Sequence, residues 1–324
     1  MKRILGIGNA LADILVKIQD DTILSVYNLP KGSMQLIDYS SACEIRNALQ
    51  NMPFQLVSGG SAANTICGIA RMGVPASFVG KVGKDVYGNK YVADLQWHGV
   101  CPQMIVSEDM SGFCTALISL DGERTMATYL GTAADLQAKD IVPSMFENYD
   151  MVHVEGYLLQ NHDLIQHIMQ SAKKANMEIS LDLASYNVVE DNLDFLQNMV
   201  SQYVDIVFAN EEEAKAYTGK SPEEALSVIA QQCNIAVVKV GKQGSWVQQG
   251  EHILHVDVYE AQRVDTTGAG DLYAAGFLAG YAQDKAIQQC ALMGSYVSSM
   301  IVEVVGAKFS EQKWQEINKR LTDL

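Results

Sequence analysis

Short apolar runs alternate with longer amphipathic segments along most of the chain. The short runs predict buried strands, several of them apolar on both faces as in a parallel sheet, at residues 3–8, 77–83, 151–156, 178–183, 205–210 and 235–241. Apolar positions with helical spacing predict helices at residues 61–72, 86–97, 161–175, 211–218, 222–232, 271–283 and 284–302. Strands that alternate with helices indicate βαβ units, and therefore an α/β fold with a mostly parallel sheet.

Two regions depart from this alternation. Residues from about 12–40 and 103–131 place apolar and polar positions with period two and contain the turn sequence LDGE, as antiparallel strands do. They predict a small β-sheet beside the main body, which serves either as a lid over a cleft or as structural decoration. Since no linker or repeat interrupts the chain, we expect one domain over residues 1–324 with this discontinuous β lid.

Composition narrows the range of partners. The 324 residues are 48% hydrophobic and carry a formal net charge of −15, which argues against nucleic acid or an anionic membrane as a partner. The six cysteines are scattered without a C-x-x-C pair, as is typical of reduced thiols in a cytosolic protein. No apolar run is long enough to span a bilayer. We therefore expect a cytoplasmic protein that acts on small molecules.

The clearest chemical signal is the segment RVDTTGAGDLYAAGF, residues 263–277, a tight turn that leads into a helix of small and apolar residues. A helix N-terminus carries unpaired N–H groups and a partial positive charge, so it binds anions. Gly268, Ala269 and Gly270 leave room for a phosphate to approach these groups. The segment therefore predicts a phosphate-binding turn.

Asp271 directly follows that turn. An acidic residue is favoured in the first turn of any helix, which is one explanation. The other is that Asp271 accepts a proton from a hydroxyl that attacks a phosphoryl group, while the turn stabilises the developing charge. Asp265 and Thr266 are candidates to cap the turn.

Two further motifs place polar side chains near glycines in the first fifth of the chain. GIGNALADI sets Asn9 and Asp13 at the end of the first predicted strand, as either turn residues or hydroxyl ligands. In VSGGSAANT, Gly59 and Gly60 permit close backbone approach and Asn64 can donate and accept hydrogen bonds. The alternative for this second motif is an ordinary helix start.

Two later motifs follow predicted strands. In ANEEEA, Asn210 and Glu213 are either a helix start with favourable acidic residues or holders of a hydrated Mg²⁺. In KVGKQGS, Gly241 and Gly244 suit either the backing of a nucleotide or a hairpin turn.

Other common motifs are incomplete. The dinucleotide pattern lacks its third glycine because Tyr273 stands there, and the P-loop pattern has Ala214 in place of its first glycine. GGSAA ends on Ala63 where a nucleophile elbow needs glycine, and the histidines form no HExxH. These absences argue against a dehydrogenase, a P-loop enzyme, a serine hydrolase and a metalloenzyme.

Four of these motifs match one family in wording and in their order along the chain: GGSAAN, NEEE, KVGKQGS and VDTTGAGD. The match extends over residues 3–307. The chain resembles the ribokinase-like (PfkB) carbohydrate kinases, and within them the bacterial adenosine kinase-like branch. The resemblance implies a three-layer α/β/α body with a mostly parallel central sheet and a small β-sheet lid. It also implies ATP as donor, Mg²⁺, and in many members a monovalent cation such as K⁺.

The resemblance also implies roles for individual residues. Asp271 becomes the base and the amides of Gly268, Ala269 and Gly270 the anion hole. Substrate-binding candidates are Asn9, Asp13, Gly59, Gly60, Asn64, Tyr129 and Tyr157, the two tyrosines being equally consistent with packing roles. Nucleotide-binding candidates are Asn210, Gly241, Gly244, Asp265 and Thr266, with Glu213 on Mg²⁺ through water. Arg124 either reaches the phosphates or pairs with a nearby acid.

The implied reaction is phosphorylation of the 5′-hydroxyl of adenosine to give AMP, a purine salvage step. Thr267 stands where many adenosine kinases carry Asn, a change shared with sugar kinases of the family. The alternatives are therefore a kinase of inosine, guanosine, ribose or fructose, and a nucleoside-binding regulator without activity. A monomer and a homodimer formed through the lid are both consistent with the resemblance.

Overall fold

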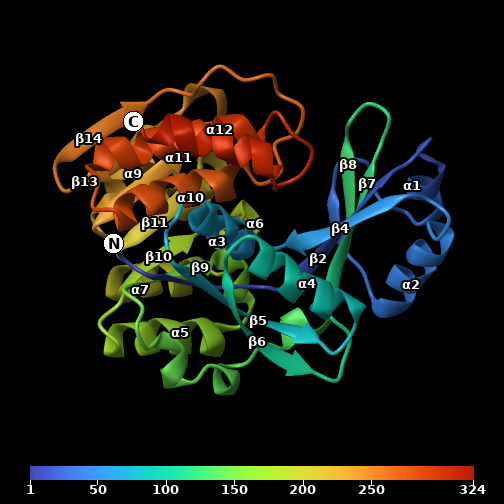
Figure 1. Ribbon diagram of the computed structural model, residues 1–324. Coiled ribbons are helices and arrows are strands. Elements are labelled where there is room, and N and C mark those ends of the chain that lie inside the picture. The colour runs from blue at the N-terminus through green and yellow to red at the C-terminus, as the bar shows by residue number, and fades with distance from the viewer.

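The computed structural model describes all residues from 1 to 324, which form two β-sheets of different size (Figure 1). The strands of the larger sheet are β1 (Ile4–Ile7), β5 (Ala76–Gly83), β6 (Cys101–Ser107), β9 (Met151–Glu155), β10 (Glu178–Asp182), β11 (Ile206–Asn210), β12 (Ile235–Lys239), β13 (Ser245–Gln249) and β14 (His252–Val256). Across the sheet they follow the order β14-β13-β12-β11-β10-β9-β1-β5-β6. Neighbours from β12 to β6 pair in parallel, and β13 and β14 add an antiparallel hairpin at one edge.

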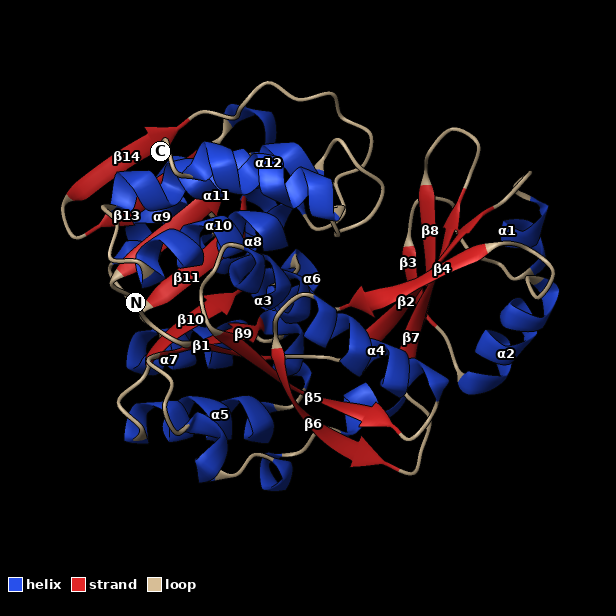
Figure 2. Cartoon of the chain, in the orientation of Figure 1, coloured by secondary structure: helices blue, strands red, loops and turns tan.

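Helices cover both faces of this sheet, as the colouring by element in Figure 2 shows. The helices are α1 (Thr22–Val26), α2 (Tyr39–Ala48), α3 (Ser61–Arg71), α4 (Val86–Trp97), α5 (His162–Lys174), α6 (Tyr186–Asp191), α7 (Leu193–Tyr203), α8 (Glu211–Thr218), α9 (Pro222–Ala230), α10 (Ala269–Ala282), α11 (Ile287–Ile301) and α12 (Glu311–Leu321). One face packs against α3, α10, α11 and α12 through residues such as Ile66 and Phe277. The other packs against α5, α7, α8 and α9 through residues such as Ile165 and Tyr217. This confirms the three-layer α/β/α body; none of its helices combines the length and apolarity that crossing a membrane requires.

The smaller sheet stands to one side of this body (Figure 1). Its strands are β2 (Leu11–Lys17), β3 (Met34–Leu36), β4 (Phe54–Gly59), β7 (Gly112–Ile118) and β8 (Arg124–Tyr129), in the order β3-β8-β7-β2-β4. On β2, Ala12, Ile14 and Val16 are buried in a cluster that also contains residues of α1 and α2. Because side chains alternate along a strand, Asp13 lies on the opposite face of this sheet.

The membership of two strands differs from the sequence-based expectation. Residues 103–107 belong to β6, which pairs in parallel with β5 and so extends the larger sheet. In its place, β4 joins the smaller sheet by pairing antiparallel with β2. The sequence pattern misled here because β6 is a half-buried edge strand, and the order of its apolar and polar residues does not show which sheet it joins.

Candidate active site

Polar side chains gather where the parallel strands of the larger sheet end. Asn9, Glu155, Asp182, Asn210 and Lys239 lie at or just after the carboxyl ends of β1, β9, β10, β11 and β12. Since these strands run parallel, their carboxyl ends share one edge of the sheet, which is where open α/β sheets bind ligands. The N-termini of α3 and α10 face each other across this edge, because side chains of α3 hydrogen-bond to Asp271.

The turn before α10 presents unpaired backbone amides. Gly268 has a φ of 76°, in the left-handed region, and a Cβ there would collide with the Cβ of Ala307. The N–H of Ala269 donates to the carbonyl of Thr266 at 3.1 Å, whereas those of Gly268, Gly270 and Asp271 donate to no group of the protein. The free donors are thus residues 268, 270 and 271. This corrects the expectation for Ala269, whose amide closes a tight turn and is already engaged.

Small residues let α10 approach its neighbours closely and so hold this turn in place. A Cβ on Gly276 would contact the backbone of Met293 in α11, and a Cβ on Gly68 of α3 would contact Ala275. Nearly every side chain of α10 after its first turn is buried. The run of Ala and Gly that follows GAGD is therefore explained by packing, which in turn makes the N-terminus of the helix rigid.

Asp271 is held by two side chains of α3. The Oγ of Ser61 donates to Oδ1 at 2.7 Å, and the Nδ2 of Asn64 donates to Oδ2 at 2.9 Å. Ser61 thus binds Asp271 and makes no capping bond of its own, since α3 begins after Gly60 without a side-chain cap. Burial raises the pKa of Asp271 to about 6, although both hydrogen bonds act in the opposite direction. A carboxylate of this kind accepts a proton more readily than an exposed aspartate.

Lys239 lies beside the same turn, and the sequence analysis did not identify it. Its Nζ is 3.0 Å from Oδ2 of Asp182 and 3.2 Å from the position that a Cβ on Gly270 would occupy. Only 15% of the lysine side chain and 8% of the aspartate side chain are exposed. The available signal was the charged residue that ends each of two otherwise apolar strands, EISLD and IAVVK.

Glu155 is a second residue that the sequence analysis overlooked. Its Oε1 accepts from the backbone N–H and from Nδ2 of Asn9, each at 2.8 Å, and its Oε2 accepts from the N–H of Ala62 at 2.9 Å. Burial raises the pKa of this carboxyl to about 7 despite these donors. Glu155 therefore joins the end of β1 to the start of α3. It also accepts one of the two N–H groups of the Asn9 side-chain amide, which leaves the other N–H and Oδ1 of Asn9 for a ligand.

Asp13 reaches the site from the smaller sheet. Its carboxylate makes no hydrogen bond within the protein, and a Cβ on Gly59 would collide with it. Burial raises the pKa of Asp13 to about 6, with Lys308 and Arg124 lowering it and Asp271 raising it further. Gly60 has a φ of 92° and passes close to the carbonyl of Asn9. Both carboxylate oxygens of Asp13 are thus free to accept hydrogen bonds, and the backbone of Gly59 and Gly60 lies close to them and to Asn9. This arrangement suits a ligand that carries hydroxyl groups.

Arg124 of β8 connects the smaller sheet to the turn before α10. Its Nη2 lies 2.8 Å from Oδ2 of Asp265, and its Nη1 donates to the Oγ1 of Thr267 at 3.3 Å. Asp265 also accepts from the N–H groups of Thr267 and Gly306. Both oxygens of Asp265 are thus engaged in shaping the turn, and Thr266 contributes through its carbonyl. The ion pair of Arg124 and Asp265 is nearly buried, with 9% of each side chain exposed.

Asn210 and Glu213 form a reciprocal cap at the start of α8. Glu213 accepts from the N–H of Asn210 at 2.8 Å and from its Nδ2 at 2.7 Å, while Oδ1 of Asn210 accepts from the N–H of Glu213 at 2.8 Å. Burial raises the pKa of Glu213 to about 7. No group of three or more His, Cys, Asp and Glu side chains is placed to hold a metal ion. Both carboxylate oxygens of Glu213 are engaged by Asn210, so Glu213 offers a metal ion no oxygen without a hydrogen-bond partner.

Gly241 and Gly244 lie in the turn between β12 and β13. Both have positive φ, 54° and 87°, and Gly244 passes against the carbonyl of Val256. The two strands pair antiparallel, so the glycines make a hairpin turn. That turn follows Lys239 directly, which keeps it at the edge of the sheet where the site lies.

The two candidate tyrosines are placed differently. Tyr157 follows Glu155, and its OH donates to the carbonyl of Ala184 at 3.5 Å. Burial raises the pKa of Tyr157, and the carboxylates of Glu155 and Asp271 act in the same direction. Tyr129 of β8 pairs with Phe113 of β7. Asp13 of β2 pairs with the next residue of β7, Cys114, and so belongs to the neighbouring row of cross-strand partners. Because neighbouring rows point to opposite faces, Tyr129 faces away from Asp13 and packs against the apolar cluster of the smaller sheet, which favours the packing role over the substrate-binding role.

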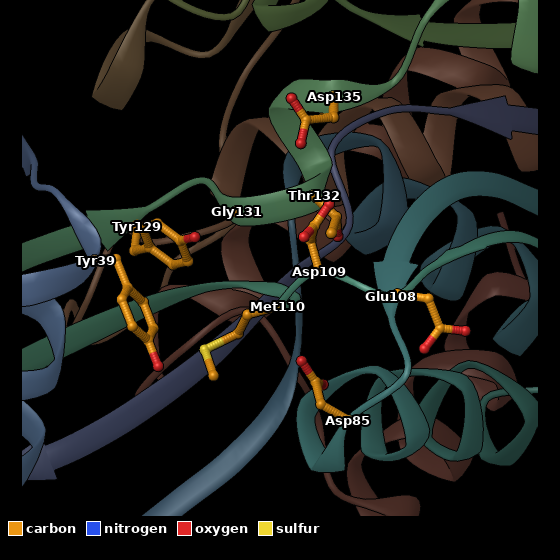
Figure 3. Close-up of a pocket in the computed structure, with 9 residues that line it drawn as sticks. All are labelled: Tyr39, Asp85, Glu108, Asp109, Met110, Tyr129, Gly131, Thr132 and Asp135. Atoms are coloured by element: carbon orange, nitrogen blue, oxygen red, sulfur yellow. The ribbon is translucent and has the colours of Figure 1, made fainter.

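Tyr129 instead lines a separate cavity of about 570 Å³ together with Tyr39 (Figure 3). The other lining residues are Asp85, Glu108, Asp109, Met110, Gly131, Thr132 and Asp135. None of the residues that surround Asp271 belongs to this cavity, and its carboxylates would repel a triphosphate. The polar side chains around Asp271, at the edge of the larger sheet, thus form a separate candidate site.

Comparison with known proteins bears on the family and the fold. Residues 31–314 match the model of the pfkB family carbohydrate kinases. The probable sugar kinase of Rhizobium etli superimposes with a TM-score of 0.88 at 30% identity, over 100% of this chain and 99% of that one. The adenosine kinase of Sinorhizobium meliloti gives 0.87 at 31% identity, over 98% and 99%. The 5-dehydro-2-deoxygluconokinase of Bacillus subtilis is 28% identical over 82% of this chain and 87% of its own length. The match to the family model spans most of the sequence, and the chain is therefore a member of the pfkB family of carbohydrate kinases.

Proposed function

We propose that this protein transfers the γ-phosphoryl group of ATP to the 5′-hydroxyl of a nucleoside, adenosine before others, and releases AMP and ADP. One observation carries the proposal: the carboxylate of Asp271, fixed by Ser61 and Asn64, adjoins the unpaired amides of Gly268 and Gly270. This arrangement pairs a proton acceptor with a site for developing negative charge. Phosphoryl transfer from a nucleotide to an alcohol needs both.

The step follows from this placement. The acceptor hydroxyl loses its proton to Asp271 as its oxygen forms a bond to the γ-phosphorus. The bond between that phosphorus and the β,γ-bridging oxygen breaks, and ADP leaves with the electron pair. The amides of Gly268 and Gly270 donate to the equatorial oxygens of the group in transit, whose charge is then stabilised without reorganisation of the protein.

The smaller sheet supplies the acceptor site in this proposal and acts as a lid. Asp13 accepts hydrogen bonds from two neighbouring ribose hydroxyls, since both of its oxygens lack a partner in the protein. The side-chain Oδ1 of Asn9 adds a further acceptor, while Glu155 holds the same side chain in position through Nδ2. The Arg124–Asp265 pair holds the sheet against the turn, which shields the reaction from water.

ATP and Mg²⁺ are the proposed donor and cofactor, as membership of a kinase family favours. Mg²⁺, when bound, neutralises charge on the triphosphate. Glu213 would act on it through water, because both carboxylate oxygens already accept hydrogen bonds from Asn210. We place no monovalent cation.

Adenosine is the first candidate acceptor because an adenosine kinase is among the structural neighbours at 31% identity. The kinase of a free sugar is the second candidate, since a 5-dehydro-2-deoxygluconokinase aligns with most of the chain and Thr267 replaces the Asn of many adenosine kinases. Phosphate transfer to adenosine, inosine, guanosine, ribose and fructose, measured by coupled ADP release at one enzyme concentration, separates them. We expect the highest kcat/KM with adenosine. A higher value with ribose or fructose would overturn the nucleoside assignment and keep the kinase.

An inactive nucleoside-binding regulator is the outcome that would overturn the kinase itself. Calorimetry would then show adenosine binding, while no ADP is produced from any acceptor at any Mg²⁺ concentration. A regulator without catalytic activity has no need of Asp271 beside the GAGD turn. The presence of both therefore favours a kinase over a regulator.

The pH dependence of kcat/KM tests the ionisation state of the base. The pKa values of Asp271 and Asp13 are both raised to about 6, so each carboxyl is ionised above that pH and protonated below it. The active form is therefore lost as the pH falls, and we expect kcat/KM for the acceptor to drop by about tenfold or more for each unit below pH 6. A profile that stays flat down to a pH of about 4, with the protein still folded by circular dichroism, would contradict this.

A further inference from the structure

The proposed mechanism leaves one buried cation at the edge of the sheet without a role. Lys239 ends β12, and its ammonium lies 3.2 Å from the position that a Cβ on Gly270 would take. It therefore stands beside one of the amides that we assign to the transferring group. Asp182, at the end of β10, holds the ammonium at 3.0 Å.

Lys239 remains charged in this setting. Burial by itself lowers the pKa of Lys239, but the carboxylates of Asp182 and Glu213 outweigh that effect and the net shift is upward. An ammonium has three donors and no acceptor. Asp182 takes one of them, and no other hydrogen bond of this ammonium is made within the protein. Two donors are left for a ligand.

We propose that Lys239 is a further catalytic residue, whose ammonium contacts the γ-phosphoryl group during transfer. This inference rests on the proposed function. Charge on the equatorial oxygens and the bridging oxygen grows as the phosphorus moves to the acceptor hydroxyl, and the ammonium neutralises part of it. Lys239 keeps its protons throughout, since Asp271 takes the one from the hydroxyl. Asp182 is a positioning residue that fixes the direction of the Lys239 side chain.

The alternative is that Lys239 and Asp182 form a purely structural ion pair. Removing one member of a buried pair leaves the other uncompensated, so a single variant can lose activity through local damage. The double variant Lys239→Met/Asp182→Asn removes both charges together. A structural pair predicts that activity returns in the double variant, whereas a catalytic ammonium predicts that it stays lost.

The experiment compares Lys239→Met, Asp182→Asn and the double variant with the wild type, using ATP and the best acceptor of the panel. We expect Lys239→Met and the double variant both to lower kcat by about 10²-fold, with KM for the acceptor changed by less than about threefold. Asp182→Asn retains the ammonium of Lys239, so we expect its kcat to fall by less than about tenfold. Calorimetry with ATP and thermal unfolding show that each variant is folded and binds the donor.

Lys173→Met is the matched control. It removes a lysine–aspartate pair of the same type, with Lys173 Nζ 2.6 Å from Asp205 Oδ2, at the opposite edge of the same sheet. We expect its kcat to equal that of the wild type. A double variant with wild-type kcat would overturn the catalytic role of Lys239 and leave the kinase assignment intact. A wild type that makes no ADP from any acceptor would instead remove the proposed function on which the inference rests.

Discussion

Replacement of Asp271 by Asn is expected to lower kcat by about 10²–10⁴-fold, because the acceptor hydroxyl then has no group to take its proton. The amides of Gly268 and Gly270 remain, so affinity for ATP should be little changed. The side chain keeps its shape, and the Oδ1 of Asn64, which is buried without a partner, can accept from the introduced amide once Asn64 rotates. The variant therefore removes the charge with little structural change.

Steady-state kinetics and calorimetry on the same preparation check this prediction. The control is stability: burial disfavours ionisation of Asp271, so loss of this charge should leave the midpoint of thermal unfolding at pH 7.5 unchanged or higher. Ser61→Ala, which removes one of the two groups that orient the carboxylate, should give a smaller loss of kcat. If Asp271→Asn turned over at a rate near that of the wild type, proton removal by this residue would be ruled out.

Replacement of Asp13 by Ala should raise KM for the acceptor by about 10- to 100-fold, which is the worth of one or two hydrogen bonds to a charged group. Asp13 has no partner within the protein, so its oxygens are available to the ligand in the ground state and in the transition state alike. Contacts of equal strength in both states change KM and leave kcat nearly constant. The effect thus differs in kind from that at Asp271.

Comparison of KM and kcat for Asp13→Ala with those for Asp20→Ala provides the check. Asp20 follows β2 on the same sheet and is exposed, and its carboxylate binds only the N–H of Thr22. We expect wild-type constants for that control. A large fall in kcat for Asp13→Ala at saturating acceptor, without a change in KM, would contradict a binding role and indicate instead that Asp13 tunes the base.

Much of the body was predictable because its local patterns agree with its tertiary structure. The apolar runs at residues 151–156 and 235–241 became β9 and β12, since a strand covered on both faces must be apolar throughout. The turn at GAGD and the helix after it were predictable for the same reason, as glycine permits the left-handed φ of Gly268 and small residues allow close packing. The smaller sheet was predicted only in outline, because alternation does not reveal which sheet an edge strand joins.

The roles of individual side chains divided in a similar way. Asp271 and its turn are contiguous, so the proposed role of both could be predicted from one segment. Glu155 and Lys239 are single charges at the ends of apolar strands, and their partners lie in distant parts of the chain. For Tyr129 the family resemblance left a substrate-binding and a packing role open, and the register of β8 against β7, which turns it away from Asp13, favours packing.

The sequence by itself determined the α/β architecture, the glycine turn before α10 and the acid that follows it, because each depends on neighbouring residues and on the period of the apolar positions. Only the tertiary structure decided which charges meet that turn. Four charged residues from four strands of two sheets converge there: Lys239, Asp182, Glu155 and Asp13. They converge because parallel strands end at one edge of the larger sheet and the smaller sheet lies against that edge. Such convergence depends on strand order and register, which local sequence does not encode.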